Sequence, residues 1–181
     1  MALGFRIANL LGFQAVWFAS VFGAGSDRPW LGPLVASVFV AAHLAASPDR
    51  RGDLRLLALA LALGAVVDSL FAASGLLRYA GAWPSEALAP GWILAMWAGF
   101  ALTLHHSMAF LRGRPAAAAA FGLVGGPLAY WAAQRGFGAV AFEAGTAPAL
   151  ALVGLGWALA LPLLYAAGAR TSPPRTREAA A

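Results

Sequence analysis

The sequence predicts an all-α integral membrane protein: a bundle of six transmembrane helices with both termini in the cytoplasm. Composition is the first observation behind this prediction, because 61% of the 181 residues are hydrophobic and only 10% are charged, whereas about a quarter are charged in soluble proteins. The second is that the apolar residues form six runs, most of them close to the about 20 residues that a spanning helix needs. A soluble domain of useful size is therefore excluded.

Helices are the expected form of all six runs, because hydrocarbon offers backbone groups no partner outside the segment and the chain lacks the alternation of a membrane β-barrel. In order, the runs are 7–24, 30–46, 56–77, 92–111, 116–133 and 147–167. The first follows Arg6, and Asn9 and Gln14 interrupt it. These polar residues are untypical of a cleaved signal peptide, so we expect this run to remain as a span.

Proline supports the remaining helix boundaries. Pro29, Pro90, Pro115 and Pro148 stand at the beginnings of the second, fourth, fifth and sixth runs, where a missing N–H group costs nothing. Pro162 lies inside the sixth run and predicts a kink there. The third run begins instead after a charged stretch, with Arg55 as its last charged residue.

Arginine distribution predicts the orientation. With six spans, nine of the twelve basic residues fall on the side of the termini and three on the other side. Positively charged loops stay in the cytoplasm, so both termini are expected there. We expect residues 1–169 to form the membrane domain and residues 170–181 to form a disordered cytoplasmic tail. The nine are Arg6, Arg50, Arg51, Arg55, Arg112, Arg114, Arg170, Arg175 and Arg177, and the three are Arg28, Arg78 and Arg135.

Several classes of function are excluded by residues that the chain lacks. It has no cysteine, which removes thiol catalysis, iron–sulfur clusters and covalent haem attachment. It has no glycine-rich phosphate loop and no dinucleotide fingerprint, so we expect no cofactor. Its arginines are scattered through short loops, so no nucleic-acid partner is expected.

Ionisable residues within the spans are the candidate catalytic residues, since such groups are costly in a membrane. Asp68 is the only acid in the predicted spans and would serve either as a proton or ligand site or as a hydrogen-bonded strut between helices. His105 and His106 are adjacent and would point about 100° apart on a helix. We assign His106 as a general acid or base and Asp68 as its electrostatic partner, because His105 shares a face with small residues suited to packing.

The other polar residues of the spans predict a polar pocket in two layers. The helical rise offsets Asp68 from His106 by about 10 Å along the bundle, which argues against direct contact. No metal site is expected, because the spans offer only three histidines and one aspartate without metal-ligand spacing. The predicted pocket residues are Asn9, Gln14, His43, Thr103, Ser107 and Tyr130.

Four stretches of the chain carry a resemblance to a known family: 9–18, Asp68, 90–107 and 125–130. In this combination the chain resembles an uncharacterised family of small polytopic proteins of the bacterial inner membrane, a domain of unknown function. Asn is usual in that family at the position of His105. The resemblance implies a multi-pass protein of the inner membrane. Genes of the family often lie beside genes for cyclopropane-fatty-acid-synthase-like enzymes, which implies a role in lipid modification or envelope stress.

Three hypotheses for the function follow. The first is a component of membrane lipid modification, an enzyme or a partner that presents acyl chains to soluble lipid-modifying enzymes. The second is a small proton-coupled transporter that titrates Asp68 and, having few spans, works as a homodimer. The third is a non-catalytic assembly factor whose polar residues only hold the bundle together.

Overall fold

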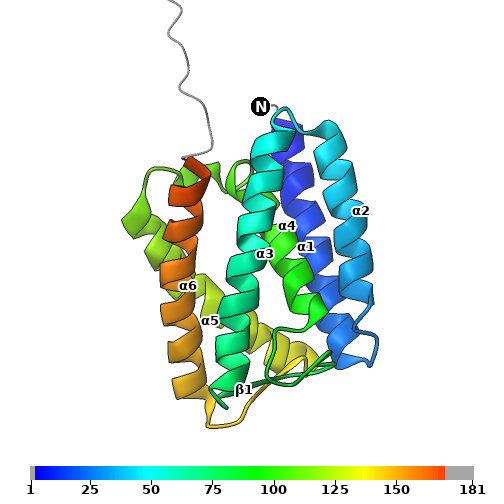
Figure 1. Ribbon diagram of the computed structural model, residues 1–181, viewed down its shortest axis with the longest axis vertical. Helices are drawn as coiled ribbons and strands as arrows, with labels where there is room; N and C mark the ends of the chain where they lie inside the picture. Colours follow the sequence, from blue (N-terminus) through cyan, green and yellow to red (C-terminus); the bar gives the residue numbers. More distant parts are fainter. Residues whose placement is uncertain (1–2, 170–181) are drawn as a thin grey trace, which may run out of the picture.

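The computed structural model describes residues 3–169, and within them the chain forms six α-helices, one 3-10 turn and one pair of short strands (Figure 1). The predicted helical fold is confirmed in the number and order of its helices. In chain order the elements are α1 (Leu3–Gly25), α2 (Leu31–Ala46), α3 (Arg50–Ala73), β1 (Leu77–Tyr79), α4 (Gly91–Leu104), η1 (Ala109–Leu111), α5 (Pro115–Phe137), β2 (Val140–Phe142) and α6 (Thr146–Ala169).

The helices pack as two groups that α3 joins. Helix α4 contacts α1, α2 and α3, α1 packs along α2, α5 packs along α6, and α3 also contacts α6. Figure 1 shows the N-terminal end of α1 and the C-terminal end of α6 at the same end of the bundle. The predicted tail at 170–181 lies outside the described residues.

The predicted bounds of the third and fourth helices differ from those of the structure. The third helix begins at Arg50 rather than at 56 because Asp49 caps it, its Oδ1 accepting from the Gly52 backbone N–H. It also ends earlier, at Ala73, because the following residues turn into β1. The fourth helix ends at Leu104 rather than at 111. Its last turn tightens, since the N–H groups of His106 and Met108 both donate to the Thr103 carbonyl.

A small β-structure closes the end of the bundle away from the termini. Strands β1 and β2 pair antiparallel, with Arg78 opposite Ala141. An exposed ion pair joins β1 to the residue that follows β2: the Nε atom of Arg78 lies 2.6 Å from Oε1 of Glu143. The sequence analysis placed Leu77 at the end of a helix and missed both strands. The pairing places the segments that follow α3 and α5 at the same end of the bundle.

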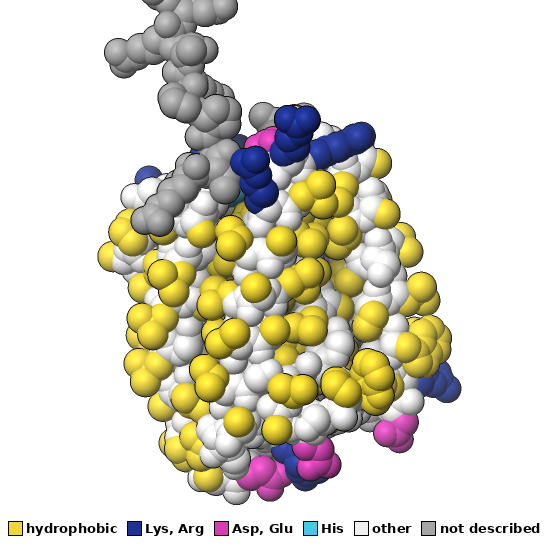
Figure 2. Space-filling view, in the orientation of Figure 1, with side chains coloured by type: hydrophobic (Ala, Val, Ile, Leu, Met, Phe, Trp, Pro, Cys, Tyr) yellow, Lys and Arg dark blue, Asp and Glu magenta, His cyan; other side chains and the backbone are white. Residues whose placement is uncertain are grey.

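Four of the helices within the described residues are long and apolar enough to cross a membrane: α1, α3, α5 and α6. Helices α2 and α4 are apolar but have 16 and 14 residues, about 24 and 21 Å, which is less than the about 30 Å of a bilayer core. Figure 2 shows a broad band of hydrophobic side chains, with charged side chains gathered at the two ends of the molecule. These features are those of a membrane protein.

Close packing at the centre of the bundle depends on glycine. The rings of Trp97 and Trp157 stack 4.5 Å apart at an angle of 9°. Gly64 of α3 lies against Trp97, where a Cβ atom would come within 2.3 Å of the ring, and Gly126 of α5 lies against Trp157 in the same way at 2.7 Å. Small residues let membrane helices approach closely, so these glycines bring α3 and α5 onto the stacked pair.

Candidate functional site

Asp53 is the centre of a polar cluster at the terminal end of the bundle. It lies in the first turn of α3 and is 1% exposed. A carboxylate in this position is stabilised by the helix dipole, and the early start of the helix at Arg50 turns the side chain inward. Because the third run was predicted to begin at 56, Asp53 fell outside the predicted spans and outside the predicted site.

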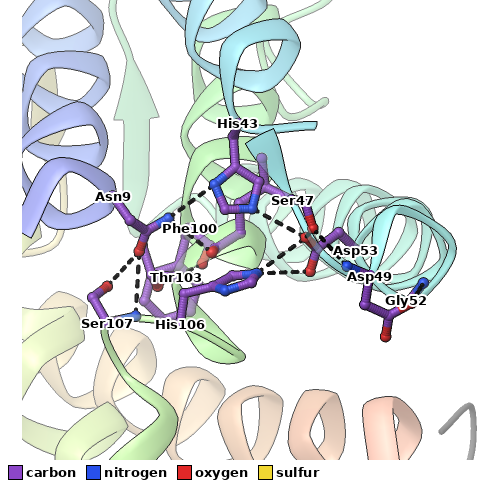
Figure 3. Close-up of polar contacts among 11 residues, drawn as sticks. Asn9, His43, Ser47, Asp49, Gly52, Asp53, Phe100, Thr103, His106 and Ser107 are labelled. Atoms are coloured by element: carbon purple, nitrogen blue, oxygen red, sulfur yellow. Dashed lines mark hydrogen bonds and ion pairs between the residues drawn. The ribbon is translucent and has the colours of Figure 1, made fainter. Parts of the chain in front are cut away.

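Two histidines from other helices meet the carboxylate of Asp53 (Figure 3). His43, near the end of α2, places Nε2 3.1 Å from Oδ2. His106, just beyond α4, places Nε2 3.0 Å from both oxygens. Ser47 adds a hydroxyl donor to Oδ2 at 2.6 Å. Both histidines are at most 5% exposed, so α2, α3 and the turn after α4 are joined by buried polar contacts.

Asn9 extends the cluster and fixes the tautomer of His43. Its Oδ1 accepts from the backbone N–H and the hydroxyl of Ser107, and its Nδ2 donates to the Leu102 carbonyl at 3.0 Å. The amide therefore turns its nitrogen toward Nδ1 of His43, 3.3 Å away. Since that nitrogen must accept, the proton of the neutral His43 ring is on Nε2 and is donated to Asp53. A chain of hydrogen bonds thus runs from Ser107 to Asp53.

This cluster can hold a proton and position it. An aspartate oriented on a histidine is the pair that general acid–base catalysis uses, and His106 is the histidine that contacts both oxygens of Asp53. Side-chain atoms of His43, Asp53 and His106 also lie within 4.8 Å of one another, close enough to bind one metal ion. Asp53, not Asp68, is therefore the acidic partner of His106.

His105 and Thr103 lie outside this cluster. His105 follows the last residue of α4, and its Nε2 packs near Gly168 of α6. Burial, helped by the positive charge of Arg112, lowers the pKa of His105. The expectation that the adjacent histidines point to different places is confirmed, although the chain has left the helix at this point. Thr103 is buried and donates back to the Phe100 carbonyl at 2.7 Å, so it stabilises the end of α4.

Asp68 forms a second polar layer near the opposite end of the bundle. It is fully buried, and three donors contact it: Trp97 Nε1 at 2.6 Å from Oδ2, Tyr79 at 2.8 Å from Oδ1, and Tyr130 on the same oxygen. Asp68 is five residues from the end of α3, about 8 Å along the axis. Through these contacts Asp68 ties α3, α4 and α5 to strand β1.

The two layers are farther apart than the sequence indicated. Asp53 and Asp68 are 15 positions apart on α3, which corresponds to about 22 Å. His106 contacts Asp53 and therefore lies at the opposite end of α3 from Asp68.

An apolar cavity of about 610 Å³ lies between α1, α4, α5 and α6. Its wall is rich in aromatic side chains, among them Phe13, Trp17 and the stacked pair of Trp97 and Trp157. Four of the predicted pocket residues line it: Gln14, Thr103, Ser107 and Tyr130. The residues of α4 that face it extend from Trp92 to Thr103, about 16 Å of helix.

The cavity reaches both polar layers. Ser107 lines it and also donates to Asn9 of the Asp53 cluster, while Tyr130 lines it and also donates to Asp68. The predicted polar pocket is thus divided: Asn9 and His43 belong to the cluster, and the other four residues line the cavity.

Asp53 and Ser47 are the site residues that the sequence analysis missed. The signal for Asp53 was present, because Asp49 follows Pro48 and lies ahead of the short charged stretch that leads into the apolar run at 56. An aspartate just before a helical segment is typical of a helix N-cap. Starting the helix at that cap would have placed Asp53 one turn inside the helix. Ser47 carried no comparable signal.

Comparison with known proteins adds one match. The family model described as Protein of unknown function (DUF2878) matches residues 6–163. Neither a curated protein nor a solved structure matches the chain significantly. The match covers nearly all of the six-helix domain and includes both polar layers and the cavity. The chain therefore belongs to the DUF2878 family, a family of proteins of unknown function.

Proposed function

We propose that this protein is a multi-pass protein of the bacterial inner membrane that binds the acyl chain of a lipid and takes part in membrane lipid modification. The observation that carries the proposal is the apolar cavity of about 610 Å³, a volume within the about 300–1,000 Å³ of small-molecule sites. A lipid chain is the apolar ligand that a protein with four spanning-length helices meets in its surroundings.

The selectivity of such a site must come from packing and from polar groups. A bilayer is as apolar as the cavity, so moving a chain from one to the other yields little hydrophobic free energy. Close contact with the rigid rings of Phe13, Trp17 and Trp97 provides dispersion contacts instead. At the end nearest the Asp53 cluster, the Ser107 hydroxyl donates to Asn9 and keeps lone pairs that accept from a lipid headgroup.

The Asp53 cluster is the proposed place of chemistry or of headgroup recognition. His106 is buried on Asp53, one residue from Ser107. This places an acid–base pair beside the polar end of the cavity. With both termini in the cytoplasm, this end faces the cytoplasm, where soluble lipid-modifying enzymes would reach it.

The transporter alternative is less well supported. It needs Asp68 to change its protonation state as substrate moves, but both oxygens of Asp68 accept from side chains of three different elements. Such an arrangement favours a structural strut.

The test is a lipid profile of a strain that lacks the gene, complemented with variants of the cavity. Gly125 lines the cavity, and a Cβ atom there meets only Phe121 at an ordinary 3.5 Å, so Gly125→Leu fills the cavity without a backbone clash. Gly136 is on the same helix, exposed and without neighbours within 4 Å, which makes Gly136→Leu the matched control.

We expect the deletion to change one or more acyl species, and the wild type and Gly136→Leu to restore them. Gly125→Leu, present at the same level in the membrane, should not restore them. An unchanged profile in the deletion strain, under normal growth and stress, would remove lipid modification as the function.

A further inference from the structure

We propose that His43, Asp53 and His106 bind a divalent transition-metal ion, with Zn²⁺ as the ion to test first. This inference does not depend on an acyl chain in the cavity. The sequence analysis expected no metal because it took Asp68 as the only available acid, whereas the structure brings Asp53 between the two histidines.

The three side chains are a suitable set of ligands. Imidazole nitrogen and carboxylate oxygen are ligands that Zn²⁺ and Fe²⁺ share, and two histidines with one carboxylate form a recurring three-ligand site that leaves further positions open. Each residue comes from a different part of the fold: the end of α2, the start of α3 and the turn after α4. Such a site fixes these three parts relative to one another.

The distances fit with small adjustments. Bonds of about 2.0–2.1 Å to a tetrahedral ion separate neighbouring ligand atoms by about 3.3 Å. Nε2 of His43 lies 3.1 Å and Nε2 of His106 3.0 Å from the carboxylate of Asp53. Each nitrogen thus needs to move away from the carboxylate by only a few tenths of an ångström. The three ligand atoms all lie within 4.8 Å of one another, and the two nitrogens adjust to the same spacing as the ion replaces the Nε2 protons.

The surroundings also fit an ion. All three residues are at most 5% exposed, so the ion would be shielded from competing water. The Ser47 hydroxyl holds Oδ2 of Asp53 at 2.6 Å, which orients the carboxylate as supporting residues do in metal sites. Phe5 packs against both histidine rings, with centroids 5.4 Å away.

Binding requires one change, at Asn9. An ion on Nε2 of His43 moves the ring proton to Nδ1, which then needs an acceptor in place of the Asn9 Nδ2 group. A half-turn of the amide brings Oδ1 to that position and turns Nδ2 toward the Ser107 hydroxyl, at the loss of two bonds, the one donated to the Leu102 carbonyl and the one accepted from the Ser107 backbone N–H. Metal binding is thereby coupled to Ser107, which lines the cavity.

The experiment uses the full-length protein in detergent, stripped with a chelator and titrated with Zn²⁺ alone. We expect one tightly held Zn²⁺ per chain in the wild type and a higher melting temperature with the ion than without it. His105→Ala is the matched control, since His105 lies outside the cluster, and should keep both properties.

Two variants remove ligands with little change in size. Asp53→Asn and His106→Gln should lose the bound ion and the rise in melting temperature. Their affinity for Zn²⁺ should fall by more than the about 10- to 100-fold that follows the loss of a residue that only supports a ligand. The rise is measured against each variant without metal, so a lower starting stability does not hide it. Asn9→Asp, which offers His43 an oxygen in either orientation, should bind Zn²⁺ about 10-fold more tightly.

Three results would overturn the metal site. These are a wild type that retains no Zn²⁺, ligand variants that retain as much as the wild type, or weaker binding by Asn9→Asp. None of these results bears on acyl-chain binding, so the two proposals fail independently.

Discussion

Replacing Asp53 with alanine should destabilise the protein far more than its position at the start of a helix implies. The substitution removes the acceptor of His43, His106 and Ser47. Each buried donor left without a partner costs about 1–3 kcal/mol. Ser47 is only part-buried and can turn to water. The two histidines together account for about 2–6 kcal/mol.

Asp49→Ala is the control for this prediction. Asp49 is an aspartate four positions earlier, exposed, and caps the same helix through one hydrogen bond to Gly52, so its loss should cost about 1 kcal/mol. Both variants are compared with the wild type by denaturant titration in detergent micelles, giving the free energy of unfolding. Equal losses in the two variants, or a loss below about 1 kcal/mol for Asp53→Ala, would refute the buried cluster.

Three further predictions concern other parts of the bundle. Asp68→Asn should lower the melting temperature while leaving Zn²⁺ binding at the Asp53 cluster unchanged, and Tyr130→Phe, which removes one of three donors, should have the smaller effect; a metal titration and a melting curve check both. Gly64→Ala should cost about 1–3 kcal/mol by overpacking against Trp97, and an unchanged melting curve would contradict the close approach of α3 and α4. The pKa of His105 is lowered in the folded protein, so near and below pH about 6.5 the unfolded chain binds more protons than the folded chain does. The free energy of unfolding therefore falls as the pH is lowered. His105→Asn should lose less stability than the wild type between pH about 7 and 5.

The helical architecture could be predicted from the sequence because its signals are local. Runs of apolar residues, prolines at their beginnings and arginines between them depend only on neighbouring positions. The strands β1 and β2 could not be predicted in this way. They are three residues each and pair positions such as Arg78 and Ala141, so their stability comes from contacts distant in the sequence.

The site was predicted in part. His43, His106 and Asn9 were found because polar residues in apolar helices are conspicuous. Asp53 was missed because it lies beside Arg55 in a charged stretch that resembles a loop, and only the cap at Asp49 reveals that the helix has already begun. Because the third helix was predicted to begin at 56 instead of at Arg50, Asp68 was assigned as the partner of His106 in place of Asp53.

The most direct test of acyl-chain binding is native mass spectrometry of the purified protein. The wild type and Gly136→Leu should carry a lipid or fatty acid that survives detergent exchange. Gly125→Leu, whose added side chain occupies the cavity beside Phe121, should be free of it while melting at a similar temperature. If Gly125→Leu carries the same lipid at the same occupancy as the wild type, or if the wild type carries none, the cavity is not the lipid site that we propose.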